Sequence, residues 1–381
     1  MSAHPVIQWN EGGQAHSARW RSEAAVPPPK RVVVADDRMA ADTAYRSACE
    51  GTALLWRGDF QNARQLLQAL ARRIDRTAER RGKPAASATP AEAFHLHRKT
   101  QAQRARILGM LLLPFEPDHV IPLRRAPDVQ QACSEAYGTA EEPYVASLRE
   151  LLGLIGAHEW RRKGVEIPAL GARVHPHYGV FSPVRGEYVD LVAQAPLPST
   201  HSAFDIGTGT GVLSAVLARR GVRHVVATDQ DPRALACARE NIERLGLTAQ
   251  VEIVQADLFP AGRAPLVVCN PPWVPARPSS PIEFAVFDPD SRMLRGFLDG
   301  LAAHLESGGE GWLILSDFAE HLGLRTRDEL LGYIDKAGLT VLGKLDARPR
   351  HPKAMDATDA LHAARAAEIT SLWRLGVRGT G

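Results

Sequence analysis

The chain has few cysteines, and they are widely separated. Four residues of 381 are cysteine, and none of them belongs to a C-x-x-C pair. That spacing argues against a zinc site and against a disulfide framework. We therefore expect reduced and mostly buried thiols at Cys49, Cys133, Cys237 and Cys269.

Long apolar runs are also missing. The longest, residues 107–113, is far shorter than the roughly 20 residues that a helix needs to cross a bilayer. The first residues lack the basic and then apolar stretch of a secretion signal. Hydrophobic residues make up 45% and charged residues 23%, as in a globular protein. We therefore expect a cytoplasmic protein with no membrane partner.

Candidate metal ligands are scarce as well. His175 and His177 flank Pro176, yet no cysteine or acidic residue stands near them at ligand spacing. We expect packing or loop residues at these positions and no metal site.

The most informative motif is the stretch Asn270, Pro271, Pro272 and Trp273, which follows a short apolar run at residues 266–269. At the carboxyl end of a buried strand, the Asn270 side-chain oxygen and the Pro271 carbonyl can accept hydrogen bonds from one planar NH2 group. Trp273 adds a flat apolar face on which an amide or base can stack. We predict that Asn270, Pro271 and Trp273 are catalytic. The alternative is a strand terminator, because Asn before Pro often only starts a turn.

A glycine-rich loop lies upstream of this motif. Residues 203–206 have the pattern of a short buried strand, and three alternating glycines lead into a predicted helix at residues 212–220. Glycines in such a loop let a ligand approach the backbone closely. We predict cofactor contacts for Asp205, Gly207, Thr208, Gly209 and Gly211.

The glycine spacing separates two cofactor classes. Dinucleotide-binding loops favour G-x-G-x-x-G, whereas Gly207, Gly209 and Gly211 alternate and follow Asp205. An acid before the loop suits a cationic sulfonium better than a pyrophosphate. A nicotinamide-dependent oxidoreductase is therefore the less favoured interpretation.

The next predicted strand, residues 224–228, ends in an acid. Asp229 is placed to bind ribose hydroxyls, and Gln230 beside it is assigned to the same cofactor site. Asp231 is the predicted N-cap of a helix over residues 232–245.

A further predicted strand, residues 251–254, leads to Asp257 and Leu258. There a carboxylate can accept a hydrogen bond from an adenine amino group, so we assign both residues to the cofactor site. The alternative for Asp257 is a solvated turn residue.

Together these motifs resemble a class I S-adenosylmethionine-dependent N-methyltransferase, over residues from about 175 to 375. The resemblance is to the "methyltransferase small domain" group, which methylates a glutamine of release factors or guanine N2 of ribosomal RNA. Its cofactor loop, ribose acid, adenine acid and amine clamp fall on residues 205–211, Asp229, Asp257 and residues 270–273.

Two features leave the acceptor open. The fourth clamp residue is usually Tyr in release-factor enzymes and Phe in the guanine enzymes, whereas this chain has Trp273. Tyr178 and Phe181 lie in a segment that resembles one in the guanine enzymes that packs over the cofactor, and we assign both to substrate binding. The Ile-Pro-Arg-Pro-Glu-Thr-Glu signature of release-factor enzymes is not reproduced.

The resemblance implies S-adenosylmethionine as cofactor and a seven-stranded, Rossmann-like α/β sheet over residues 165–381. The substrate would be a protein, such as a translation factor, or RNA. Because 381 residues exceed one catalytic unit, we expect a second domain at residues 1–164, mainly helical and engaged in substrate recognition. A catalytically silent RNA-binding relative is the main alternative.

The amino-terminal residues predict a small hairpin followed by helices. Its two strands are expected at residues 6–9 and 16–20, and a strand pair at 165–167 and 173–175 leads into the second domain. Apolar residues at helical spacing predict helices at residues 43–55, 60–81, 89–113 and 143–160, with a loop at 82–87.

Positive charge is concentrated in one stretch of this region. Residues 72–106 hold ten Lys and Arg against three Asp and Glu. Such a stretch can bind RNA phosphates, although a solvated, Arg-rich helix face explains it equally well.

Overall fold

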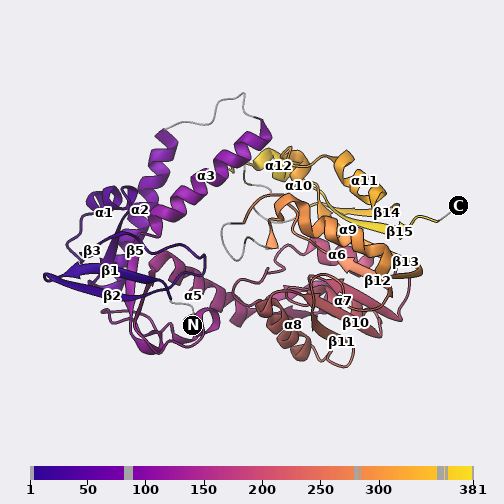
Figure 1. The fold of residues 1–381 in the computed structure, drawn as a ribbon, viewed down its shortest axis with the longest axis horizontal. Helices are drawn as coiled ribbons and strands as arrows, with labels where there is room; N and C mark the ends of the chain where they lie inside the picture. Colours follow the sequence, from indigo (N-terminus) through magenta and orange to yellow (C-terminus); the bar gives the residue numbers. More distant parts are fainter. Residues whose placement is uncertain are drawn as a thin grey trace. The chain divides into compact units, whose positions relative to one another are not determined.

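The computed structural model describes residues 4–80, 89–278, 283, 285–349, 356 and 359–379 (Figure 1). The chain divides into two compact units, each taken by itself below. The amino-terminal unit comprises Met1–Ala88 and His95–Glu159, and the carboxy-terminal unit comprises Thr89–Phe94 and Trp160–Gly381. In the described residues, no helix is both long enough and apolar enough to cross a membrane.

The amino-terminal unit is built on a six-stranded sheet in the order β1-β2-β6-β5-β4-β3. Strands β3, β4 and β5 run parallel to one another, whereas β6 is antiparallel to β5. The strands are β1 (Val6–Glu11), β2 (Gln14–Trp20), β3 (Arg31–Ala35), β4 (Thr52–Trp56), β5 (Leu111–Phe115) and β6 (Tyr144–Ser147). The helices of this half of the chain are α1 (Ala41–Cys49), α2 (Phe60–Arg80), α3 (Pro90–Leu108), α4 (Gln130–Tyr137) and α5 (Leu148–Lys163).

The prediction of a mainly helical amino-terminal domain is therefore wrong. The hairpin of β1 and β2 is confirmed. However, β4, β5 and β6 occupy the ends or starts of stretches predicted as helices, and β3 was not predicted at all. Strands buried on both faces are continuous apolar runs, which periodicity cannot distinguish from a buried helix. The predicted loop at residues 82–87 lies outside the described residues.

Helix α3 begins as predicted but ends before β5. The Thr89 hydroxyl accepts a hydrogen bond from the Glu92 backbone N–H, and the Glu92 carboxylate accepts one from the Thr89 N–H, which confirms the capping box. The first turn groups with the carboxy-terminal unit. There Phe94, only 3% exposed, belongs to an apolar cluster with Val274 and Phe318.

The carboxy-terminal unit contains the predicted seven-stranded sheet, in the order β11-β10-β9-β12-β13-β15-β14. Six strands run in one direction, and β15, which lies between β13 and β14, is antiparallel to both. The strands are β9 (Ser202–Ile206), β10 (His224–Asp229), β11 (Val251–Gln255), β12 (Ala264–Cys269), β13 (Leu305–Ser316), β14 (Leu339–Ala347) and β15 (Thr370–Val377). The predicted pair β7 (Val165–Ile167) and β8 (Ala172–Val174) precedes them and is also confirmed.

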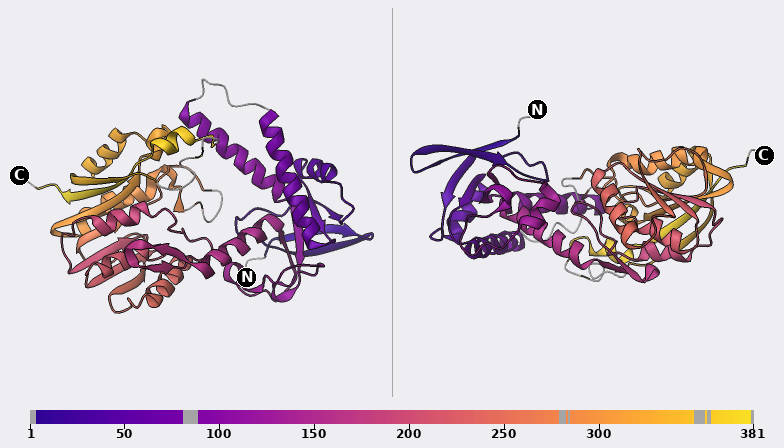
Figure 2. Two further views of the ribbon diagram at one scale, coloured as in Figure 1. Left: turned by 180° about the vertical axis from the view of Figure 1, so that it is seen from behind. Right: turned by 90° about the horizontal axis from the view of Figure 1, so that it is seen from below.

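Helices cover both faces of this sheet (Figure 2). The alternation of β9 assigns its residues to opposite faces: Ala203 packs with α6, α7 and α8, whereas Phe204 and Ile206 pack with α9 and α11. The helices are α6 (Glu187–Gln194), α7 (Val212–Arg219), α8 (Pro232–Arg244), α9 (Arg292–His304), α10 (Phe318–His321), α11 (Arg327–Lys336) and α12 (His362–Ala367). Two cores thus hold the strands rigidly and leave their carboxyl ends for a site.

Candidate active site

The two main sequence motifs meet at the carboxyl edge of the seven-stranded sheet. In the parallel pairing of β9 with β12, Ile206 lies opposite Cys269. The next residues, Gly207 and Asn270, therefore leave neighbouring strands side by side. Helix α7 follows β9 on one face and α9 follows β12 on the other. A doubly wound sheet has its binding crevice where the connections diverge in this way.

The glycine loop turns sharply between β9 and α7. Gly207, Gly209 and Gly211 have φ angles of +71°, +56° and +80°, which residues with a side chain rarely adopt. A side chain at Gly207 would also meet the end of Met293, only 2.5 Å from the ideal Cβ position. The alternating spacing is thus required by the backbone path.

Asp205 is buried beneath this loop, with an exposed fraction of 1%. Its Oδ2 accepts hydrogen bonds from the Thr208 hydroxyl at 2.7 Å, the Ser214 hydroxyl at 2.6 Å and the Ser214 backbone N–H at 3.1 Å. Burial raises the pKa of Asp205, although these hydrogen bonds oppose the rise. Both Asp205 and the Thr208 hydroxyl therefore brace the loop from within.

Asp229 joins the end of β10 to the same loop. Its Oδ2 accepts a hydrogen bond from the Gly209 N–H, and its Oδ1 accepts one from the Asp231 N–H, both at 3.0 Å. Burial raises the pKa of this carboxyl group. Asp231 caps α8 as predicted, by accepting from the Arg233 N–H.

Gln230 and Asp257 are brought together by β10 and β11. The Gln230 side-chain N–H donates to Asp257 Oδ1 at 2.7 Å, and both residues are exposed. Leu258 has a φ of +70°, and its carbonyl accepts a hydrogen bond from the Thr228 hydroxyl at 2.5 Å. These contacts place the predicted adenine-binding residues beside Asp229.

The amine-clamp residues interact with one another. Trp273 donates its indole N–H to the Asn270 side-chain oxygen at 2.9 Å. The Trp273 ring is partly buried and packs against the cores on both sides of the sheet. Pro271 is buried. Its ring fixes the φ angle of the chain as it leaves β12.

Tyr178 and Phe181 lie in the segment before α6. The Arg233 guanidinium lies 5.8 Å from the centroid of the Tyr178 ring, at the start of α8. Phe181 is partly buried and packs against the core beneath α6, α7 and α8. Tyr178 is thus close to the start of α8, which follows the carboxyl end of β10.

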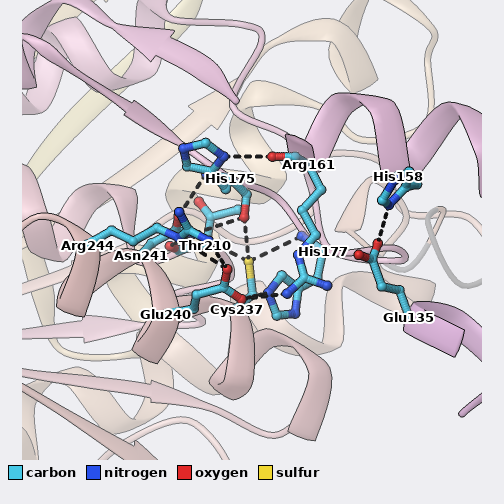
Figure 3. Close-up of polar contacts among 10 residues, drawn as sticks. All are labelled: Glu135, His158, Arg161, His175, His177, Thr210, Cys237, Glu240, Asn241 and Arg244. Carbon is cyan, nitrogen blue, oxygen red and sulfur yellow. Dashed lines mark hydrogen bonds and ion pairs between the residues drawn. The ribbon is translucent and has the colours of Figure 1, made fainter. Parts of the chain in front are cut away.

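Two residues of α8 that the sequence did not single out bind the chain before α6, and one of them also binds the glycine loop (Figure 3). The Asn241 amide donates to the carbonyls of Thr210 and His175, and its oxygen accepts from the His175 N–H. Asn241 is 1% exposed. A polar residue on the buried face of a predicted helix was the available signal.

Glu240, one residue earlier, accepts hydrogen bonds from Arg161, His177 and Arg244 at 2.6 to 2.7 Å (Figure 3). Burial by itself would raise the pKa of Glu240. The hydrogen bonds together have the larger effect and lower the pKa to about 2. His177 therefore has an acidic partner, from outside its sequence neighbourhood. In the described residues, no group of three or more His, Cys, Asp or Glu side chains could hold a metal ion.

Glu240→Gln is expected to lower the free energy of unfolding by about 1–3 kcal/mol at pH 7, after allowance for solvent screening of a side chain that is 24% exposed. The folded-state pKa lies below the ordinary 4.5, so this stabilisation is present above pH 4.5 and disappears as the pH falls towards 2. Urea unfolding of both proteins across this pH range measures it. Glu243→Gln, on the exposed side of α8, is the control. If the difference in free energy of unfolding between wild type and Glu240→Gln does not vary with pH, the lowered pKa of Glu240 is contradicted.

In a comparison with known protein families, one family model covers the carboxyl ends of β9, β10, β11 and β12. The model of the methyltransferase small domain matches residues 171–326, which include the glycine loop and the clamp.

Curated relatives match part of the chain. A release factor glutamine methyltransferase of Cereibacter sphaeroides is 32% identical over 188 residues, covering 44% of this chain and 63% of that protein. A second, of Caulobacter vibrioides, is 33% identical and covers 40% and 56%. A ribosomal protein L11 methyltransferase of Pelotomaculum thermopropionicum is 46% identical over 71 residues, covering 18% and 23%. The chain thus spans less than two thirds of the length of each.

Proposed function

Because residues 171–326 belong to the methyltransferase small domain family, we propose that the chain is an S-adenosylmethionine-dependent methyltransferase acting on nitrogen. The acceptor is an amide or exocyclic amine of a macromolecule. The amino-terminal unit serves substrate recognition. The proposal agrees with the resemblance found in the sequence.

One observation carries this proposal: the glycine loop and the amine clamp leave adjacent parallel strands, with Ile206 opposite Cys269. A methyl donor held by the loop and an acceptor held at Asn270 are then neighbours in one crevice. Holding two reactants in this way removes much of the entropic barrier to their reaction.

The residues present fit the methyl donor. Gly207 and Gly209 are only partly buried and have no side chain to keep a ligand from the backbone. The Asp229 carboxylate can exchange its backbone partners for two ribose hydroxyls. Asp257 stands beside it as an acceptor for an adenine amino group. When bound there, S-adenosylmethionine supplies an electrophilic methyl group on a positively charged sulfur.

The clamp orients the acceptor nitrogen. The Asn270 side-chain oxygen has two lone pairs, of which Trp273 uses one, so a second remains for an acceptor N–H. The Pro271 carbonyl takes the other N–H of the same NH2 group. The nitrogen lone pair is thereby turned towards the glycine loop. No strong base is required, because the N–H becomes acidic once nitrogen gains a methyl group.

Of the two acceptor classes, we favour a protein glutamine amide. Two of the relatives that match this chain are release factor glutamine methyltransferases. An RNA base is the second candidate, and the basic residues of α2 and α3 support it. Among them, however, Arg73 is paired with Asp42, and Arg104 with Asp75.

Incubation of the protein with cell extract and S-adenosylmethionine labelled in its methyl group tests this function. We expect label that protease releases and ribonuclease does not. If ribonuclease releases the label and protease does not, the acceptor is RNA and not a protein. An absence of any incorporated label, together with an absence of cofactor binding in calorimetry, would contradict the proposed function.

A salt titration tests the RNA alternative separately. If the α2 and α3 residues bind RNA, affinity must fall steeply with salt, with a slope in log units of about −0.7 per phosphate contacted on a single strand. Arg72→Glu, at an exposed position of α2, should make the salt dependence less steep. Glu243→Gln on α8 should leave it unchanged. Retention of RNA that is independent of salt, or no retention at low salt, would leave these arginines as a solvated face.

A further inference from the structure

The hydrogen bond between Trp273 and Asn270 fixes the orientation of the clamp amide. An indole N–H is only a donor, so it can face the Asn270 oxygen but not the Asn270 NH2 group. Rotation of the amide by 180° would place two donors against each other. Tyr and Phe, the usual residues at this position of the resembled enzymes, have no ring N–H for this contact.

Arg185 in turn supports the indole. Its guanidinium carbon lies 5.0 Å from the centroid of the Trp273 ring. Its Nε donates to Glu187 and its Nη2 donates to Glu368, both at 2.9 Å. The two carboxylate side chains are only 3% and 1% exposed. A planar guanidinium can stack on a ring and bind two carboxylates at once, which a lysine ammonium cannot reproduce.

The far end of this network is anchored to the sheet. Glu368 Oε1 also accepts a hydrogen bond from the Ser316 hydroxyl at 2.6 Å. Ser316 is the last residue of β13, the strand next to β12, and it pairs with Thr370 at the start of β15. The contacts therefore run from the end of β13 and the start of β15, through Arg185, to the clamp after β12.

We infer that Arg185 is a positioning residue for the methyl acceptor and acts through Trp273 on the amide of Asn270. This inference rests on the proposed function. In it, Trp273 is not primarily a stacking platform. Its N–H occupies one lone pair of Asn270 and leaves the other aimed at the acceptor, so that the clamp is ordered before the substrate arrives.

The contacts can be tested without any acceptor. The chain has seven tryptophans, and Trp273→Phe identifies the Trp273 indole N–H signal in 1H–15N spectra by removing it. We expect Asn270→Ala to shift that signal upfield and to speed its exchange with solvent. Arg185→Lys, which keeps the charge between the two buried carboxylates, should cause a smaller change of the same kind. A signal unaffected by Arg185→Lys would overturn the role of Arg185.

Kinetics on the acceptor that carries the label test the consequence. Trp273→Phe keeps an aromatic face and loses the N–H, so we expect kcat to fall by about tenfold with little change in KM or in cofactor affinity. Arg185→Lys should lower kcat in the same way by a smaller factor. Trp160→Phe, at a tryptophan that is 52% exposed, is the matched control.

A Trp273→Phe enzyme with normal kcat and a raised KM would overturn the inference in favour of a platform. If the wild-type protein transfers no label and binds no S-adenosylmethionine, the proposed function fails, yet the spectra still decide whether Arg185 and Asn270 are coupled through the indole.

Discussion

Replacement of Asn270 by alanine is expected to reduce turnover by about a hundredfold or more while leaving the affinity for S-adenosylmethionine nearly unchanged. Asn270 follows β12, one strand away from the glycine loop, and its free lone pair faces the acceptor in the proposed mechanism. An interaction that orients the nucleophile contributes mainly in the transition state. Single-turnover rates and calorimetry on the same protein separate the two quantities.

Asn270→Asp keeps an acceptor oxygen for both the indole and the substrate, so we expect it to retain more activity than Asn270→Ala. Asn10→Ala, on the exposed edge of β1, controls for the loss of an asparagine elsewhere. Wild-type turnover in Asn270→Ala would show that residues 270–272 merely end a strand.

Asp229→Ala should weaken binding of S-adenosylmethionine by about 1–3 kcal/mol, or roughly 5- to 150-fold in Kd. The mutation removes the proposed acceptor for the ribose hydroxyls and also the partner of the Gly209 N–H. Burial raises the pKa of Asp229, so wild-type affinity should start to fall, as the pH is lowered, at a higher pH than for an ordinary aspartate. Isothermal titration calorimetry measures both effects.

Asp299→Ala is a suitable control for this experiment, because Asp299 lies on the exposed face of α9. Asp229→Asn keeps one acceptor oxygen, so its affinity for S-adenosylmethionine should lie between those of Asp229→Ala and Asp299→Ala. Unchanged affinity in Asp229→Ala, or tight binding of NADH by the wild-type protein, would contradict the cofactor assignment.

The carboxy-terminal sheet could be predicted because its signals are local. Strands β9, β10, β11 and β12 are short and mostly apolar, and each is followed by a polar or glycine motif. The Asp231 cap marks the start of α8. The order of four such motifs carries the family resemblance, and that resemblance implies the seven-stranded sheet. The register that brings Gly207 beside Asn270 comes from the pairing of β9 with β12, which the sequence alone does not give.

The amino-terminal sheet could not be predicted in the same way. Strands β4 and β5 are apolar runs of five residues that adjoin helices. Between the apolar end of α3 and the start of β5, Gly109 is the single glycine or proline that could mark a boundary. Only tertiary pairing, of Leu54 with Leu111, decides that these segments are extended.

The contacts that refine the site were beyond the sequence for a similar reason. Trp273 and Asn270 are three residues apart, so their hydrogen bond depends on a local turn that Pro271 alone does not specify. Arg185 reaches Glu368 across 183 positions of the chain. Such pairings are set by the fold, and a single sequence carries no record of them.

The first turn of α3 has a consequence for how this protein can be divided. Phe94 comes from the first quarter of the chain but completes an apolar cluster with Val274, the neighbour of Trp273. A fragment that starts at residue 165 would lack this side chain and expose its partners beside the clamp. An exchange of the two halves, in the laboratory or during evolution, therefore has to carry residues 89–94 with the carboxy-terminal half, even though they lie between α2 and α4 in sequence.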